Sequence, residues 1–305
     1  MTLHEIPLER RTLHGHFSRD LEPILSVAAG DSIAFACLNS GWRTAAHEVF
    51  PQRREGELDA GHALIGPIEV RGAQVDQTLE VQIDQVRIGA SGVTQAGGWS
   101  TPLNERLGVA GGETVTRIWT LDADAGSGRD ESGREVILRP FLGVIGMPPD
   151  EPGIHSTGPP RPCGGNIDCK ELVAGTTLYL PIPVDGALLS AGDGHAAQGD
   201  GEVSQLAIEA PVERAQLTLS VRDDLRLEMP IAWTPEAWLT FGFDEDLDEA
   251  AALAIDAMLA LMGREHGLER REALAFASIV VDLRVTQMVN GVRGIHARLA
   301  HDALR

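Results

Sequence analysis

The stretch SAGDGHAAQGDGEVSQLAIE (190–209) gathers acidic and histidine side chains between glycines. Asp193 and His195 are two residues apart, so in an extended chain their side chains point to the same side. A carboxylate and an imidazole placed in this way can bind one divalent cation, and histidine among carboxylates favours zinc or another transition metal. A solvated Asp-Gly hairpin turn or a calcium loop would use the same residues, although the EF-hand spacing is absent.

The segment CGGNIDCKEL (163–172) holds a second group of residues suited to chemistry. Gly164 and Gly165 form a flexible turn whose backbone N–H groups can face an oxyanion, and Asn166 adds an amide donor. Asp168 is a further candidate metal ligand. Both glycine-rich segments are expected to form loops, and together they would supply one site.

A cysteine nucleophile is the alternative interpretation of the same segment. Cys169 precedes the only lysine, Lys170, and Glu171 follows. A Cys/Glu/Lys set carries amide hydrolysis in nitrilase-type enzymes, but those enzymes alternate strands and helices, which this sequence does not. An inert, partly buried thiol is therefore favoured. Neither a G-x-S-x-G serine elbow nor a G-x-x-x-x-G-K-[ST] phosphate loop occurs.

The charge balance excludes several kinds of partner. The chain has 25 Lys and Arg against 45 Asp and Glu, a net charge of −20, so we expect neither nucleic acid nor a membrane surface as a partner. No apolar run reaches the roughly 18 residues of a membrane helix, and the first residues lack the apolar core of a signal peptide. The three cysteines follow no disulfide pattern, and these features together predict a cytoplasmic protein.

Short apolar runs separated by Gly, Pro and Asp clusters fill the first two thirds of the chain. They predict strands, and the lack of long helical periods between them favours a sandwich or barrel over a doubly wound sheet. The glycine-rich run 190–209 leads into the predicted strand 205–210. The predicted strands cover 32–38, 78–88, 114–122, 176–182, 205–210 and 215–221.

Beyond residue 245 the apolar period becomes that of helices. Acidic residues open, and glycines close, a predicted helix over 246–267. Residues 271–289 begin as a helix and pass into a strand, and a last helix is predicted over 290–303. The predicted class is a β-dominated α+β fold, with a β-sandwich body and a helix-containing C-terminal region.

Three regions are expected within one compact unit. Residues 1–147 form a β-rich region, 148–245 carry the active-site loops, and 246–305 form a helix-rich α+β region. The proline-rich segment 146–165 is either a linker or a long functional loop stiffened by its prolines.

Residues 164–209 resemble the core signature of the acetamidase/formamidase family, beginning GGNIDCKELVAGTTLYLPI. HALIGPIEVRGAQVDQTLEV (62–81) and VDLRVTQMVNGVRGIHARL (281–299) are similar to two further segments of that family. The resemblance implies hydrolysis of short aliphatic amides to a carboxylate and ammonia, a β-sandwich fold, a bound divalent metal and a homo-oligomer. The chain departs from the family at residues 75–77 and at Asn39, where relatives often carry an aspartate.

Metal-dependent amide hydrolysis assigns a role to each candidate. Asp168, Asp193 and His195 are the predicted ligands of a divalent ion, with zinc favoured over calcium. Glu202 is the predicted general base, which later gives its proton to the leaving ammonia.

The remaining candidates would handle the small amide substrate. Backbone N–H groups of Gly164 and Gly165, with Asn166, would hold the oxyanion. Gln198 and His62 would either orient the substrate or hold the metal ligands in place. The alternative function is a non-catalytic β-sandwich binding protein stabilised by calcium.

Overall fold

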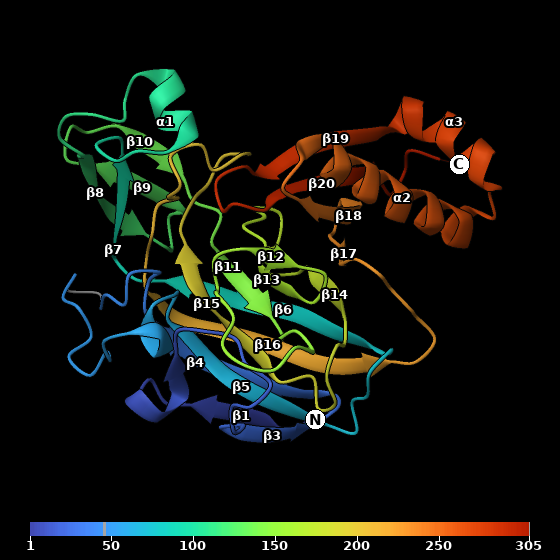
Figure 1. Cartoon of the computed structure of the whole chain (residues 1–305), viewed down its shortest axis with the longest axis horizontal. Coiled ribbons are helices and arrows are strands. Elements are labelled where there is room, and N and C mark those ends of the chain that lie inside the picture. Colours follow the sequence, from blue (N-terminus) through green and yellow to red (C-terminus); the bar gives the residue numbers. More distant parts are fainter. Residues whose placement is uncertain (45–46, 305) are drawn as a thin grey trace.

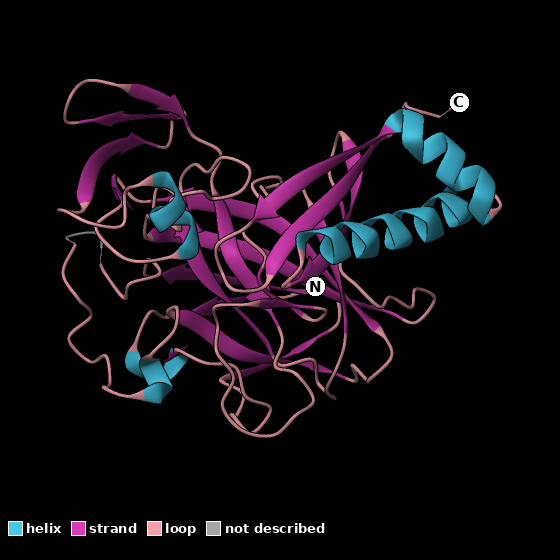
Figure 2. Ribbon diagram, turned by 45° about the horizontal axis from the view of Figure 1, so that its top comes forward, coloured by secondary structure: helices cyan, strands magenta, loops and turns pink. Residues whose placement is uncertain are grey.

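Strands dominate the molecule. The computed structural model, which describes residues 1–44 and 47–304, has 41% strand and 14% helix. Figures 1 and 2 show layered sheets with two helices gathered at the C-terminal end of the chain. The predicted β-dominated α+β class is confirmed.

The largest sheet among the described residues has nine strands. It combines strands from all three predicted regions, so these regions share one sheet. In spatial order the strands are β1 (Leu3–Ile6), β4 (Asp31–Cys37), β16 (Val212–Arg222), β6 (Thr78–Ile88), β14 (Thr177–Pro181), β17 (Ile231–Trp233), β18 (Ala237–Asp244), β20 (Arg293–Ala300) and β19 (Val281–Gln287).

The second sheet carries the candidate site. Its order is β12 (Pro160–Arg161), β13 (Gly164–Asn166), β11 (Phe141–Gly146), β15 (Leu189–His195), β5 (Leu64–Arg71) and β2 (Leu13–His14), and β3 (Leu25–Ala28) also pairs with β5. A small third sheet stands apart as a lobe at the upper left of Figure 1 and orders β10 (Glu135–Ile137), β9 (Ser127–Asp130), β8 (Val115–Asp122) and β7 (Ser91–Ala96).

The two larger sheets enclose one hydrophobic core. Val81 and Leu217 from the nine-stranded sheet and Ile65 and Leu142 from the second sheet are at most 1% exposed and belong to the same apolar cluster. β6 shows the cause, because apolar residues alternate along it and one face can be buried. This packing forms the sandwich that holds the site strands rigid.

The helices lie mainly at the C-terminal end. α1 (Pro102–Leu107) belongs to the lobe. α2 (Leu247–His266) packs on β18 and β20, and α3 (Arg270–Val280) packs against α2 and β19. Short 3₁₀ turns cover Arg10–Thr12 and Glu57–Asp59. Within the described residues, no helix combines the length and apolar character needed to cross a membrane.

The helix predicted over 246–267 is confirmed, because its end signals act as expected. The Asp246 carboxylate accepts hydrogen bonds from the backbone N–H groups of the first turn, and Gly267 closes the helix at a φ of 67°. The passage from helix to strand within 271–289 is also confirmed. The predicted strands 32–38, 78–88, 114–122, 176–182 and 215–221 correspond to β4, β6, β8, β14 and β16.

Two predicted elements are wrong. The segment 290–303 contains the strand β20 (Arg293–Ala300) instead of a helix, because Ile295, Ala297 and Leu299 alternate into the core between β18 and β19. Residues 205–210 form no strand, and only Glu209 makes isolated bridges there. The acidic and histidine residues of the glycine-rich run therefore do not precede a strand but lie partly within one, β15.

His14 makes the stability of the sandwich sensitive to acid. Its Nδ1–H donates to the His16 carbonyl oxygen (2.6 Å), and its Nε2 accepts from the Ser190 hydroxyl (3.0 Å), the pattern of a neutral ring. Burial lowers the pKa of His14 from 6.5 to about 4.

We therefore expect stability to fall as the pH drops from above 6.5 toward 4, because only the unfolded chain takes up this proton in that window. The loss at pH 5 should be roughly 2 kcal/mol. Urea unfolding at pH 7 and pH 5 measures this loss. In His14→Gln the difference in unfolding free energy between pH 7 and pH 5 should be smaller by about that amount. An unchanged difference in the variant would contradict the assignment.

Candidate metal centre and active site

The centre of the candidate site lies on β15. Asp193 and His195 project to the same side of this strand, and 3.3 Å separates Asp193 Oδ2 from His195 Nε2. Both side chains are buried. The glycine-rich run forms a buried strand here because its glycines let neighbouring backbones approach, and a Cβ on Gly194 would lie 2.3 Å from the Ala210 carbonyl oxygen.

His195 is held in one orientation. The side-chain Nε2 of Gln198 donates to the Asp168 carbonyl oxygen (2.7 Å), so its Oε1 faces His195 and accepts from Nδ1 (2.9 Å). The Phe141 ring packs edge-on against the imidazole, with centroids 4.9 Å apart. Nδ1 therefore carries a hydrogen, and Nε2 is the atom that faces the acidic groups.

Glu209 completes the acidic surroundings of His195. Its Oε1 lies 3.3 Å from His195 Nε2, and its Oε2 accepts from the Ser40 hydroxyl (2.7 Å). Backbone hydrogen bonds with Val93 fix its position. A neutral imidazole would direct its Nε2 lone pair at two carboxylates, so this arrangement needs a proton or a cation between them.

Asp168 reaches the same place from the loop after β13. Its Oδ2 accepts from the Asn290 side chain (2.7 Å), and its backbone N–H donates to the Gly143 carbonyl oxygen (3.2 Å). One oxygen of Asp168, one of Asp193 and one nitrogen of His195 all lie within 4.8 Å of one another. The structure thus brings the three predicted ligands together, and their metal-binding role stays a prediction.

Gly143 makes room for this cluster. It lies on β11, beside β15, and a Cβ at this position would be 2.6 Å from Asp168 Oδ1 and 2.6 Å from Asp193 Oδ2. The same atom would be 3.0 Å from the His195 ring. No side chain fits there without displacing the acidic groups, so glycine keeps a small space open between them.

Glu202 borders the cluster. Its carboxylate lies within 4.8 Å of ligand atoms of His195 and Glu209. The backbone of Glu202 has a φ of 45°, and Asp168 and Asp193 are also left-handed, at 51° and 61°. Such a conformation costs a non-glycine residue roughly 1–2 kcal/mol and is concentrated at functional sites.

Burial and the charges of neighbouring groups together shift the pKa values of the site residues. Burial would lower the pKa of His195, but the carboxylates of Asp193 and Glu209 outweigh it and raise that pKa well above its ordinary value. Burial raises the pKa of Asp168 and of Glu202, and the charges of neighbouring carboxylates add to both shifts. Asp193 keeps its charge, because His195 and His62 more than offset burial and lower its pKa.

Three buried oxygens in this part of the sheet have no hydrogen-bond partner among the described residues. They are Oδ1 of Asn166, Asp168 and Asp193. Buried polar atoms are nearly always satisfied, and orphaned carboxylate oxygens suit a bound ion or water. A nitrogen and several carboxylate oxygens around an open space match the ligand set of a divalent cation such as zinc.

His62 and Gln198, the predicted substrate-binding residues, take different positions. His62 lies at the edge of the cluster, with its Nε2 4.0 Å from Asp193 Oδ2 and its Nδ1 2.8 Å from the Thr157 hydroxyl. Its side chain is 23% exposed, so it stands between the buried acids and solvent. Gln198 is engaged with the protein itself, as the support of His195.

The predicted oxyanion residues lie in a strand and not in a free turn. Gly164 and Gly165 belong to β13, which pairs with β12 on one side and β11 on the other. The Asn166 amide donates to the Gly158 carbonyl oxygen (3.1 Å), which leaves its buried Oδ1 unpartnered. The assignment of the oxyanion to these residues stays a prediction, and the Asn166 donor is already engaged.

Cys169 lies in a separate polar cluster. Its thiol donates to Glu171 (3.3 Å), whose carboxylate is 3.2 Å from the Arg284 guanidinium and 3.7 Å from His296 Nε2. Burial raises the pKa of Cys169 well above its ordinary value, and the Glu171 charge adds to the shift. Lys170 pairs with Asp200 at 2.9 Å. A thiol held neutral in this way is a poor nucleophile.

We expect Cys169→Ser to keep most of the hydrolytic activity, because the hydroxyl can donate to Glu171 as the thiol does. Steady-state rates and circular dichroism of the variant measure this. A loss of about a thousandfold in a folded variant would instead support a cysteine nucleophile.

Sequence analysis missed three residues of the site. Glu209 is the last residue of the glycine-rich run 190–209. Its carboxylate side chain is the signal that could have placed it in the site. Asn290 lies 122 residues from Asp168, and Gly143 acts through having no side chain. Neither gives a local signal, because each depends on which strands become neighbours.

Comparison with known proteins identifies the class first. The fold matches the crystal structure of an acetamidase from Bacillus halodurans with a TM-score of 0.84 and 29% identity over 97% of both chains. A predicted acetamidase/formamidase from Thermoanaerobacter tengcongensis gives a TM-score of 0.84 and 26% identity over 98% of this chain and 96% of that one. The class is thus a β-sandwich of the acetamidase type.

Sequence comparison then adds similarity to one family of proteins. The model of the acetamidase/formamidase family matches residues 152–291. A Schizosaccharomyces pombe protein provisionally named a formamidase is 24% identical over 303 residues, 78% of this chain and 74% of that protein. An acetamidase of Mycolicibacterium smegmatis is 50% identical over 48 residues, 16% of this chain and 12% of its own length. The middle part of the chain is thus similar to the acetamidase/formamidase family, and the whole fold is similar to that of an acetamidase.

Proposed function

We propose that this protein hydrolyses short aliphatic amides to a carboxylate and ammonia with the help of a bound divalent ion. The observation that carries the proposal is the buried cluster of Asp168, Asp193 and His195 around Gly143, whose orphaned carboxylate oxygens fit a cation. Relatives named acetamidase and formamidase support the class of enzyme, a hydrolase acting on linear amide bonds.

Asp168, Asp193 and His195 would hold the ion, and Glu209 shares His195 from the other side. An ion in such a site supplies Lewis acidity, which polarises the amide carbonyl and makes water acidic near pH 7. The histidine favours zinc over calcium, which prefers oxygen ligands alone. Gln198 contributes by fixing the Nδ1–H tautomer, so that Nε2 is the available ligand atom.

Glu202 would move the protons. Burial raises its pKa, so it can accept a proton from the attacking water and keep it until the C–N bond breaks. The same proton then goes to the departing nitrogen, which leaves as ammonia while the water oxygen stays on the carboxylate. His62, partly exposed beside Asp193, is placed to contact substrate.

The test is ammonia release from formamide, acetamide, propionamide and urea by metal-replete protein. We expect turnover of a short amide that a chelator abolishes and added metal restores. No ammonia from any of these amides would refute the proposal. Full activity after complete metal removal, verified by elemental analysis, would refute its metal dependence.

The calcium-stabilised binding protein makes the opposite prediction, with bound calcium and no turnover. Zinc as the resident ion, a homo-oligomeric state and a cytoplasmic location stay predictions from the sequence.

A further inference from the structure

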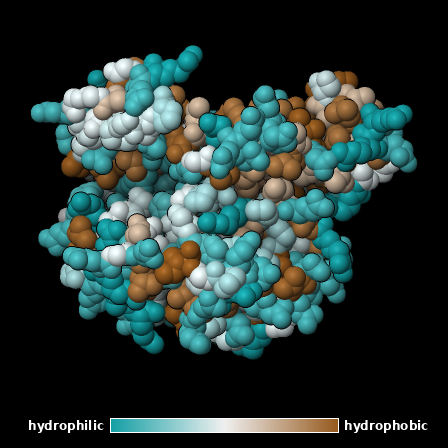
Figure 3. Space-filling model, viewed as in Figure 1, coloured by the Kyte–Doolittle hydropathy of each residue, from teal (hydrophilic) through white to brown (hydrophobic). Residues whose placement is uncertain are grey.

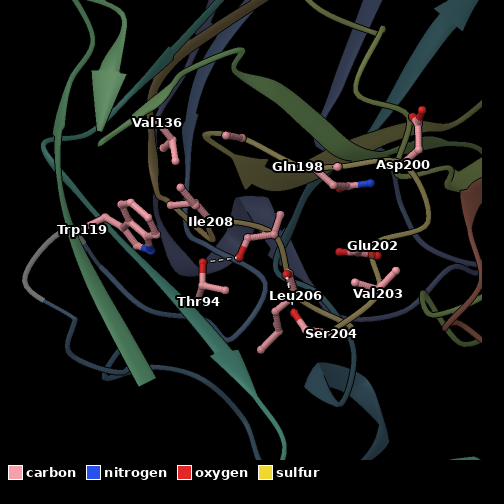
Figure 4. Close-up of a pocket in the computed structure, with 13 residues that line it drawn as sticks. Thr94, Trp119, Val136, Gln198, Asp200, Glu202, Val203, Ser204, Leu206 and Ile208 are labelled. Carbon is pink, nitrogen blue, oxygen red and sulfur yellow. Dashed lines mark hydrogen bonds between the residues drawn. The ribbon is translucent and has the colours of Figure 1, made fainter. Parts of the chain in front are cut away.

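A cavity of about 370 Å³ lies beside the candidate site, between the four-stranded lobe and residues 197–208. Figure 4 shows its lining, with Trp119 and Val136 on one side and Gln198 and Glu202 on the other. In the space-filling view the lobe at the upper left rises from the body as a separate mass. The cavity is thus built by two parts of the chain.

The two ends of this cavity differ in chemistry. At the inner end Glu202 lies within 4.8 Å of a His195 ligand atom, and Gln198 bonds to the same ring. The outer wall is mainly apolar and includes the Trp119 indole from β8, Val136 from β10 and Ile208, with the buried Trp119 N–H as an unpartnered polar atom among the described residues. A substrate whose amide meets Glu202 would therefore extend its acyl group toward Trp119.

The size of the cavity exceeds the needs of acetamide. Pockets of roughly 300–1,000 Å³ enclose drug-sized ligands, whereas the acetyl group offers a single methyl to an apolar wall. The small side chains of Ala197 and Gly199 line the cavity, and the lobe adds an apolar wall to it. Carboxylates at Asp200 and Glu202 disfavour an anionic acyl group.

We propose that this cavity is an acyl-group site and that the preferred substrates are amides with an uncharged apolar acyl group larger than acetyl, such as hexanoyl or phenylacetyl. This inference rests on the proposed amide hydrolysis. Trp119 is the specificity-determining residue, because its ring supplies the largest apolar surface of the wall. Burial of each additional methylene should raise kcat/KM roughly fourfold until the cavity is filled.

The experiment compares kcat/KM for ammonia release from acetamide, butyramide, hexanamide and phenylacetamide. Hexanamide has four more methylenes than acetamide, so we expect its kcat/KM to exceed that of acetamide by roughly 250-fold. Trp119→Ala should lower the hexanamide-to-acetamide ratio by about tenfold, and Trp119→Phe should keep most of it. Ile118→Ala is the matched control, since Ile118 is the preceding residue of β8, is 43% exposed and does not line the cavity, so the ratio should stay unchanged.

Calorimetric titration with phenylacetamide gives a second readout that does not depend on turnover. Hydrolysis of acetamide without any gain for longer amides would overturn the acyl site and leave the proposed function intact. A gain that persists in folded Trp119→Ala would overturn the role of this cavity. Binding of phenylacetamide that depends on Trp119, without any ammonia release, would overturn the proposed function alone. The absence of both binding and ammonia release would overturn the acyl site and the proposed function together.

Discussion

His195→Ala is expected to lose its bound divalent ion and its amide hydrolysis together while the sandwich stays folded. The imidazole Nε2 is 3.3 Å from both Asp193 and Glu209, and it is the only nitrogen in the predicted ligand set. Loss of residues that merely orient a ligand costs about 10–100-fold in metal affinity or activity, so loss of the ligand itself should cost more than about a hundredfold. Elemental analysis, ammonia release and circular dichroism measure the three effects.

The matched control is His266→Ala, which removes an exposed histidine in the last turn of α2. It should keep metal, activity and fold. A full complement of metal in His195→Ala would show that the imidazole is structural and that the ligand assignment is wrong.

Gly143→Ala is expected to inactivate the enzyme although it adds a single methyl group at a residue outside the motifs that predict the site. The new Cβ would lie 2.6 Å from oxygens of both Asp168 and Asp193, so the acids must separate or β11 must shift. A displacement of about 1 Å in a catalytic site can cost about a hundredfold in rate. Metal content and kcat/KM should both fall, and the thermal midpoint measures any accompanying loss of stability.

Gly111→Ala is the control for the glycine-to-alanine change itself, because a Cβ there meets nothing within 4 Å. Normal metal content and rate in Gly143→Ala would mean that the acids can rearrange freely, which would contradict the idea of a fixed space between them.

Local signals allowed much of the fold to be predicted. β6 alternates apolar residues from Leu79 to Ile83, and α2 has an acidic cap at Asp246 and a glycine at Gly267, so both follow from physical rules that act within a few residues. β20 failed for the opposite reason. Its alanine, arginine and leucine residues suit a helix, but pairing with β18 and β19 overrides that preference.

The residues of the site also divide into those that local sequence signals predict and those that depend on strand pairing. Asp193 and His195 are neighbours in sequence, so their shared direction could be predicted from strand geometry. Gly143 joins them only through the pairing of β11 with β15, and Glu209 through isolated bridges to His195 and Val93. One sequence does not specify these pairings. The glycine-rich run 190–209 was expected to form a loop before a strand. Part of it instead lies in β15, because the glycines of β15 let the neighbouring backbones approach closely on both sides.

The lobe that carries the outer wall of the cavity is one continuous piece of chain, from β7 through β10 (91–137). It leaves the sandwich after β6 and returns just before β11. Its link to the acids, the paired hydrogen bonds between Val93 and Glu209, uses only main-chain atoms and so persists when side chains change. Divergence within this segment, or its exchange between relatives in one recombination event, can therefore change which substrates the enzyme prefers. The acidic cluster, and with it the reaction, would stay the same.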